Sequence, residues 1–270
     1  MSPFVDIVIP SRGDSQSRRL LLKDIEREQK RTPDAITVTV EEGPSAAANR
    51  NAGAQRGSAP WIAFLDDDIR LPDGWLASLL EASNSASAAD VFSGPIGSIH
   101  PRNLFSMASE DFVVRHKKYG DQWFLAGALI IIRRSVFVDL GGFDERFIGA
   151  GGEDWRLCVV AHAAHCSVAV IPNLYVRHDN PRNFRQLMAR SRTYGISEAP
   201  SAPSTTSATT DSDERQTHHP LPLRVARWPV NEYRGFRLQG RSRIRSLTST
   251  ALYIPWMASY LIHARQGHER

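Results

Sequence analysis

The chain has 270 residues, of which 41% are hydrophobic and 23% are charged, and its formal net charge is +4. This is ordinary globular composition, which excludes collagen-like, coiled-coil and wholly disordered chains. Its two cysteines supply neither a disulfide framework nor a paired zinc-ligand spacing. The chain does not open with a basic stretch and an apolar segment, and its apolar residues 251–262 fall short of the ~20 that span a bilayer, so we expect a cytoplasmic protein.

The first 80 residues alternate between two kinds of pattern. Short runs rich in β-branched and apolar residues predict buried parallel strands at residues 5–10, 36–40 and 61–65. Helical spacing of apolar or alanine residues predicts helices between and after them, at residues 18–30, at 46–56 with Ser45 as N-cap, and from Asp73 as a cap to residue 80. This order predicts an α/β fold with a mostly parallel central sheet and helices on both faces.

The rest of the chain is less regular. We expect a strand at residues 124–132, a helix opening at Glu153, short strands at 168–171 and 174–178, and a helix at 183–194 that ends at Gly195. Residues 198–222 are rich in Ser, Thr, Ala and Pro and predict a flexible linker. The sequence therefore predicts a domain at 1–197, the linker at 198–222, and a basic, partly apolar helical extension at 223–270 with a kinked helix at 248–263.

Polar residues gather where the predicted strands end. Asp66, Asp67 and Asp68 follow the third strand directly, and Asp66 and Asp68 point to the same side of an extended chain. Two such carboxylates can share a divalent cation that neutralises a diphosphate, because ligands bind at the carboxyl ends of parallel strands. A solvated acidic turn is the alternative.

Two further sites carry candidate chemistry. Glu153 and Asp154 follow two glycines at a helix start, where a carboxylate can act as a general base or serve only as a cap. His178 ends a short strand and is a candidate third metal ligand or a structural histidine. Asn49, Arg50 and Asn51 can contact a nucleotide or phosphate, although packing of their helix explains the pattern equally well.

Six short motifs resemble glycosyltransferase family 2, a large group of inverting transferases with the GT-A fold. They are VDIVIP at 5–10, NAG at 51–53, IAFLDDD at 62–68, PDGWL at 72–76, GGFDE at 141–145 and GED at 152–154. The resemblance covers roughly residues 4 to 195, in the right order. It implies the GT-A nucleotide-diphospho-sugar transferase fold, and metal-dependent, inverting transfer of a sugar from a nucleotide-diphosphate donor to an acceptor hydroxyl.

The resemblance also implies roles for individual residues. Asp68 would coordinate Mn²⁺ or Mg²⁺, Asp66 would contact the ribose or the water shell of the metal, and His178 falls where some relatives have a metal-binding histidine. Asp154 would be the catalytic base, with Glu153 as the alternative. The remaining candidate donor-binding residues are Pro10, Arg12, Glu41 or Glu42, Asn51 and Asp67.

The second strand departs from the family pattern. Family members carry an Asp-Asp-Gly-Ser turn there, whereas this chain has Glu41 and Glu42 followed by Gly-Pro-Ser. UDP is the expected nucleotide, with GDP and dTDP as alternatives, and the expected acceptor is a glycan or lipid-linked sugar of polysaccharide biosynthesis. A sugar nucleotidyltransferase and a non-catalytic nucleotide-sugar-binding relative are the rival interpretations.

The extension is strongly basic. Residues 223–245 contain a single acidic residue, Glu232, and seven arginines: Arg224, Arg227, Arg234, Arg237, Arg241, Arg243 and Arg245. No nucleic-acid-binding motif accompanies them, so no nucleic acid is expected as a partner. We expect this region to dock on an anionic membrane surface, which would place the protein peripherally at the inner face of the membrane.

Overall fold

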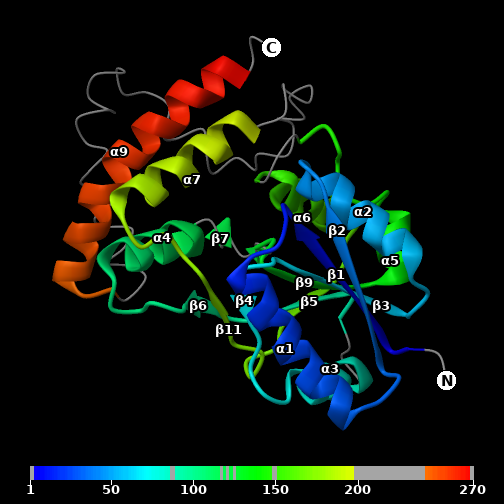
Figure 1. Ribbon diagram of the computed structural model, residues 1–270. Coiled ribbons are helices and arrows are strands. Elements are labelled where there is room, and N and C mark those ends of the chain that lie inside the picture. Colours follow the sequence, from blue (N-terminus) through cyan, green and yellow to red (C-terminus); the bar gives the residue numbers. More distant parts are fainter. Residues whose placement is uncertain are drawn as a thin grey trace.

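The computed structural model describes residues 3–85, 89–115, 118–119, 122–123, 126–147, 151–197 and 241–267. The predicted linker at 198–222 lies outside these ranges, and so do four arginines of the predicted extension, Arg224, Arg227, Arg234 and Arg237. Figure 1 shows a central sheet with helices on both faces and, beside it, a separate group of helices that includes the C-terminal one. The predicted α/β class is confirmed by this architecture.

The central sheet has six strands in the order β10-β5-β9-β3-β1-β2. In chain order they are β1 (Val5–Ser11), β2 (Ile36–Glu42), β3 (Trp61–Leu65), β5 (Val91–Ser93), β9 (Leu129–Arg133) and β10 (Val168–Val170). Strand β1 pairs in parallel with β2 and β3, and β10 pairs in parallel with β5, whereas β9 runs antiparallel to its two neighbours. The sheet is mostly parallel, as predicted, but β9 begins later than expected because the chain turns at residues 126–128.

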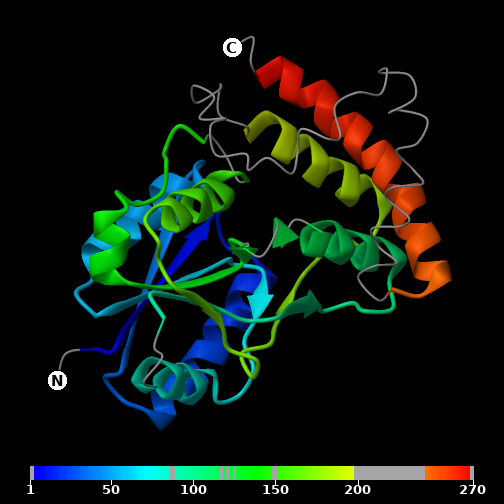
Figure 2. The same cartoon turned by 180° about the vertical axis from the view of Figure 1, so that it is seen from behind.

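Two sets of helices cover this sheet. On one face lie α1 (Gln16–Arg31) and α3 (Trp75–Asn84), and on the other lie α2 (Ala46–Arg56), α5 (Arg134–Asp139) and α6 (Glu153–Ala163) (Figures 1 and 2). Because successive strand residues point to opposite faces, Ile7 and Ile9 join the core under α1, while Val8 joins the core under α2. Because helices cover both faces of the sheet, both sides of each strand are buried, which explains the continuous hydrophobic runs of the strands.

Of the two predicted capping residues the structure confirms Ser45 and not Asp73, and it adds Ser15, which was not predicted. Ser15 accepts a hydrogen bond from the Arg18 N–H at the start of α1, and Ser45 accepts one from the Ala48 N–H at the start of α2. The prediction for Asp73 is wrong. Gly74 occupies the N-cap of α3 in a left-handed conformation, with φ 73°, because the Asp73 carboxylate is paired instead with Arg27 at 2.7 Å.

A second, three-stranded sheet was not predicted. It contains β4 (Ile69–Arg70), β11 (Val176–His178) and β6 (Ile96–Ser98), with β11 in the middle. Strand β11 is antiparallel to β4 and parallel to β6. Because β4 follows the acidic triplet directly, its pairing with β11 brings His178 opposite Ile69 and beside the triplet. A hairpin, β7 (Lys118–Tyr119) and β8 (Gln122–Trp123), completes the strands described.

The third group of helices contains α4 (Leu104–Arg115), α7 (Phe184–Ser197) and α9 (Arg243–Gly267). A small aromatic core joins them, formed by Ala108, Leu187, Tyr253 and Trp256. Helix α7 does not stop at Gly195 as predicted, and α9 starts five residues earlier than expected and continues through Pro255. Within the described ranges, no helix combines the length and apolar content needed to cross a membrane.

Buried charges connect the layers. Asp6 of β1 accepts hydrogen bonds from Thr37, the Ala59 N–H and Arg134, and Asp24 of α1 accepts two from Arg70 at 2.6 and 2.8 Å. Both carboxylates are almost fully buried, so each must be paired to be tolerated. These contacts fix the helices and strands whose ends form the site.

Candidate active site at the strand ends

The acidic triplet lies at the carboxyl end of β3. Asp66 follows the last residue of that strand, and its N–H donates to the Ala128 carbonyl at 3.3 Å. The chain then turns into β4, whose partner strand β11 is held to the triplet by a 2.8 Å hydrogen bond from the Asp179 N–H to the Asp68 carbonyl. This hydrogen bond brings together two segments that lie about 110 positions apart in the sequence.

Asp66, Asp68 and His178 form a group that can bind a metal. The His178 Nε2 lies 3.2 Å from Asp68 Oδ1 and 4.0 Å from Asp66 Oδ2, and one ligand atom from each residue lies within 4.8 Å of the others. Two carboxylates and an imidazole are a suitable donor set for Mn²⁺ and related divalent cations. It is the one such group found among the residues that the structure describes.

Asp67 faces away from this group. Its carboxylate accepts a 2.5 Å hydrogen bond from the Ser11 hydroxyl, at the end of β1. Burial raises the pKa of Asp67, against the opposing effect of the Ser11 hydrogen bond. The triplet therefore divides as the extended-chain argument predicts, with Asp66 and Asp68 on one side and Asp67 toward the first strand.

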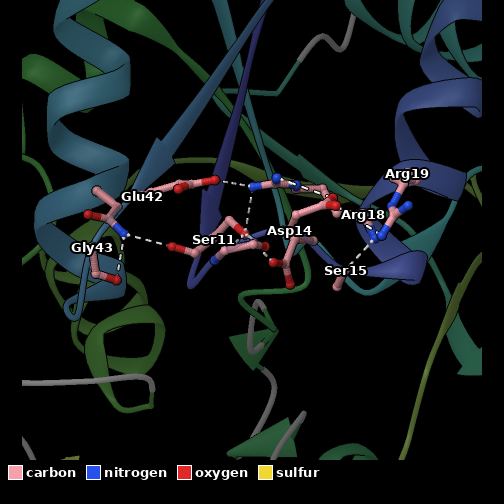
Figure 3. A network of polar contacts seen from close by, with 10 residues as sticks. Ser11, Asp14, Ser15, Arg18, Arg19, Glu42 and Gly43 are labelled. Carbon is pink, nitrogen blue, oxygen red and sulfur yellow. Dashed lines mark hydrogen bonds and ion pairs between the residues drawn. The ribbon is translucent and has the colours of Figure 1, made fainter.

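A polar network occupies the ends of β1 and β2. Arg18 of α1 contacts the Ser11 hydroxyl at 3.3 Å and Glu42 at 2.5 Å, and it also reaches Asp14 at 3.4 Å (Figure 3). The Glu42 carboxylate is more than half exposed, so a ligand can reach it. Of the two predicted glutamates, Glu42 is the one that lies in this network.

The other predicted donor-binding residues are placed differently. Glu41 is paired with Arg56 on the α2 side of the sheet, Pro10 is buried within β1, and Arg12 is exposed just beyond it. Asn51 exchanges hydrogen bonds of 2.9 Å with the backbone of Phe143. Its amide is thus occupied in holding α2 to the loop before α6, and it is not brought to the group around Asp68.

Arg50 is the residue that joins the two acidic sites. Only 2% of it is exposed, and its guanidinium contacts Asp66 Oδ1 at 2.7 Å and Glu153 Oε1 at 2.6 Å. It also lies 5.1 Å from the centre of the Phe143 ring. The sequence drew attention to Arg50 only weakly. Its spacing of three from the buried Ala47 and four from the buried Ala54 is the signal for an inward-facing arginine.

Glu153 and Asp154 have distinct surroundings. Glu153 is buried and held by Arg50 and by the Gly151 N–H at 2.7 Å. Asp154 accepts 2.8 Å hydrogen bonds from the N–H groups of Gly127 and Trp155. Burial, with the neighbouring charge of Glu153, raises the pKa of Asp154 to about 6. Asp154 therefore has the pKa of a general base that works near neutral pH.

A cavity opens next to the metal-ligand group. Its volume is about 210 Å³, and it is lined by Asp68, Asp179, Asn180, Pro181, Arg182, Gln186 and Arg190. Arg190 lies with its Nη2 3.3 Å from His178 Nε2. Sequence reasoning did not single out this arginine. The spacing of Leu187, Arg190 and Tyr194 along the inward side of α7 is the pattern that marks it.

Two family models match the chain in succession. The model described as glycosyl transferase family 2 matches residues 13–141, and the one described as glycosyltransferase like family 2 matches residues 104–196. Together they cover residues 13–196, which include the central sheet except β1, the acidic triplet, Glu153–Asp154 and nearly all of α7. The chain belongs to glycosyltransferase family 2. The family predicted from the motifs is thus confirmed, and the GT-A fold fits it.

Known glycosyltransferases resemble this family 2 chain over part of their length. The pre-mycofactocin glycosyltransferase of Mycobacterium tuberculosis is 30% identical over 177 residues, covering 59% of this chain and 35% of that protein. Validoxylamine A glucosyltransferase of Streptomyces hygroscopicus subsp. jinggangensis is 31% identical over 153 residues, covering 45% of this chain and 36% of that protein. The matched region spans about a third of the length of these relatives.

Among solved structures, the family 2 chain is similar to the Drosophila β1,4-galactosyltransferase 7. A mutant of that enzyme in complex with manganese, UDP-Gal and xylobiose gives a TM-score of 0.48 at 17% identity, covering 67% of this chain and 73% of that one. The catalytic domain in complex with xylobiose gives 0.46 at 17% identity, covering 65% and 68%.

Proposed function

We propose that this chain is a metal-dependent glycosyltransferase that moves a sugar from a nucleotide-diphosphate donor to an acceptor hydroxyl with inversion. One observation carries the proposal. The guanidinium of Arg50 connects Asp66 of the metal-ligand group to Glu153, the neighbour of Asp154. A cation-binding group and a carboxylate with a raised pKa therefore share one edge of the sheet, as a donor site and a base require.

The donor site consists of the residues at the strand ends. Asp66, Asp68 and His178 would hold Mn²⁺ or Mg²⁺, which supplies charge neutralisation and Lewis acidity at a leaving diphosphate. The exposed Glu42 and the Ser11–Arg18 network border the position proposed for the nucleoside. UDP is the proposed nucleotide, with GDP and dTDP as alternatives, and a glycan or lipid-linked sugar is the proposed acceptor.

Asp154 is proposed as the catalytic base. It takes the proton of the acceptor hydroxyl while that oxygen bonds to the anomeric carbon, and the bond to the donor diphosphate breaks with its electron pair on the departing oxygen. The Gly127 N–H fixes the carboxylate at 2.8 Å. Asp154→Asn should lower the rate of transfer by about 10²–10⁴-fold while donor binding is retained. Substantial turnover by this variant would assign the role to another group.

The experiment that tests the function is a donor screen. Purified protein with Mn²⁺ is mixed with UDP-, GDP- and dTDP-sugars, and thermal shifts and slow donor hydrolysis are measured. We expect a metal-dependent shift with one nucleotide, lost in Asp68→Ala and kept in Asp139→Ala, which changes an exposed aspartate on α5. No response to any donor from folded protein with Mn²⁺ would contradict the proposal.

The rival interpretations predict different results. A sugar nucleotidyltransferase would release pyrophosphate when a nucleoside triphosphate and a sugar phosphate are supplied in place of the donor sugars. A non-catalytic relative would bind one donor in a metal-dependent way without hydrolysis or transfer. The raised pKa of Asp154 favours a working base over a binding module, because a carboxylate that serves only as a helix cap gains nothing from it.

We propose further that α9 contacts an anionic membrane surface. Its outward side exposes 79% of Ile244, 60% of Leu247 and 39% of Ile254, while Trp256 on the opposite side is buried against α7. The exposed Arg243 precedes this stripe. An apolar helix side with cations beside it is suited to the interface of a bilayer rich in anionic lipids.

Vesicle co-sedimentation tests this contact. Replacing Ile244 and Leu247 together with serine should weaken binding to phosphatidylglycerol vesicles by about ten- to hundredfold, since both side chains would lose their apolar contact. Val138→Ser, which changes a 67% exposed valine on α5, is the matched control. Equal binding by the double variant and the wild type would rule out α9 as the contact.

A further inference from the structure

Arg190 of α7 lies directly against the metal-ligand group. Its guanidinium lines the 210 Å³ cavity together with Asp68, and its Nη2 lies 3.3 Å from His178 Nε2. The Arg190 side chain is only partly exposed, and its guanidinium carbon lies 5.9 Å from the centre of the Tyr194 ring. It is therefore part of the site wall and not a solvated surface charge.

The orientation of Arg190 is fixed by its other end. Its Nη1 donates to Asn180 Oδ1 at 3.0 Å and to the buried Ser109 hydroxyl at 3.1 Å. The next residue, Ser191, donates to the Trp256 carbonyl at 2.5 Å, which holds α7 against α9. Because Nη1 is anchored, Nη2 is the part of the guanidinium that is directed at the metal-ligand group.

This arrangement creates a conflict with a bound metal. The His178 Nε2 that converges with Asp66 and Asp68 is the same atom that Arg190 approaches. If Asp66, Asp68 and His178 hold a metal ion, its positive charge would lie close to the Arg190 guanidinium, whose Nη2 is 3.3 Å from His178 Nε2. Two cations at that spacing repel each other unless an anion lies between them.

We propose that Arg190 is a ligand of the donor diphosphate and that, without the donor, it opposes metal binding at Asp66, Asp68 and His178. The inference rests on the proposed function and adds to it. The diphosphate supplies the anion between the two cations, and a guanidinium matches the paired oxygens of a phosphate group. Metal and diphosphate therefore bind cooperatively, and Arg190 stabilises the charge that develops on the leaving diphosphate.

The test combines two measurements whose expected changes have opposite signs. In Arg190→Gln, the affinity for Mn²⁺ alone should rise by about three- to tenfold, because a neighbouring positive charge is gone. The affinity for UDP in the presence of Mn²⁺ should fall by about ten- to hundredfold, while that for UMP changes little. The kcat for transfer should fall by about 10²–10³-fold.

Two further variants keep the result interpretable. Arg190→Lys retains the charge, so its Mn²⁺ affinity should stay at the wild-type value while its preference for UDP over UMP is partly lost. Arg192→Gln changes an exposed arginine on the same helix and should behave as wild type in both measurements. Thermal melting of each variant identifies any loss of folding.

Each outcome decides the matter. An equal loss of UDP and UMP binding in Arg190→Gln, or unchanged Mn²⁺ affinity with an unchanged preference for UDP, would overturn the role of Arg190. Wild-type protein that binds Mn²⁺ but no nucleotide would overturn the proposed function, and the Mn²⁺ affinity of Arg190→Gln would still report whether the two cations compete. Wild-type protein that binds neither would overturn both.

Discussion

Arg50 is the residue on which the two halves of the site depend. Its single guanidinium contacts Asp66 and Glu153, both of which sit at element ends that must converge for the site to form. The backbone at Gly127 also lies close to Arg50 and Asp154. A Cβ on Gly127 would lie 3.1 Å from the Asp154 carboxylate and 3.2 Å from Arg50, so even an alanine would crowd the cluster.

Removing this charge should therefore cost stability. Arg50→Met keeps much of the side-chain length but leaves Glu153 buried without its partner, and we expect a loss of about 3–5 kcal/mol in the free energy of unfolding. Chemical denaturation measures it. The control is Arg56→Met on the same helix, whose arginine side chain is 66% exposed and should contribute about 1 kcal/mol or less. Similar values for the two variants would contradict the role given to Arg50.

If Asp154 is the base as proposed, it sets the pH dependence of transfer. Because its pKa is raised to about 6, the carboxyl is protonated below that pH and cannot accept the acceptor proton. We expect kcat/KM to be level above about pH 7 and to fall about tenfold per pH unit below about pH 6. Mn²⁺ affinity measured over the same range separates this effect from protonation of the metal ligands. A midpoint near pH 4 would contradict the raised pKa.

At the scale of elements, a buried carboxylate joins α1 to the end of β4. Asp24 accepts hydrogen bonds from Arg70 and from the Leu71 N–H at 3.2 Å, and it is 1% exposed. Since β4 follows the acidic triplet, this contact sets where the chain goes after Asp68.

Asp24→Asn tests that fastening. We expect a loss of about 1.5–3 kcal/mol in unfolding free energy, because charge-assisted hydrogen bonds to Arg70 become neutral ones. Asp73→Asn is the matched control. The Asp73 side chain is 67% exposed and pairs with Arg27, which lies on α1 like Asp24. A variant as stable as this control would show that Asp24 does not fix the contact.

Local patterns predicted the elements better than they predicted the site. Helix α2 was predicted at its observed bounds because Ser45 caps it and alanines favour it, and β3 was predicted from its apolar run. The pairing of β4 with β11 left no such signal, since strands of two and three residues are too short for a periodic pattern. The convergence of His178 on Asp68, like that of Arg190 on His178, follows from this long-range pairing.

At the scale of the whole molecule, the C-terminal helix α9 supports the site indirectly, by packing against α7. Helix α9 packs along α7 through Tyr253 and Trp256, whose rings stack with centres 5.7 Å apart, and the two helices lie side by side in Figures 1 and 2. Helix α7 in turn carries Arg190. Helix α9, the described part of the predicted extension, thus packs against α7 through a shared core.

Weakening the packing between α9 and α7 should destabilise α7. We expect Trp256→Ala to lower the free energy of unfolding by about 3–5 kcal/mol and to speed amide hydrogen exchange in α7. Ile254→Ala, which trims a partly exposed side chain on the other side of α9, should leave exchange in α7 unchanged. Unaltered exchange in α7 of the Trp256→Ala protein would show that α9 does not support it.

The position of α9 in the sequence has a consequence for biosynthesis. Domains fold from the N-terminus as the ribosome elongates the chain. A nascent chain that has been translated as far as residue 200 already contains Asp66, Asp68, Asp154 and Arg190, but it lacks Trp256 and the packing that steadies α7. Asp66, Asp68 and Asp154 are therefore translated before the helix that supports Arg190, and Arg190 gains that support only once α9 has been translated.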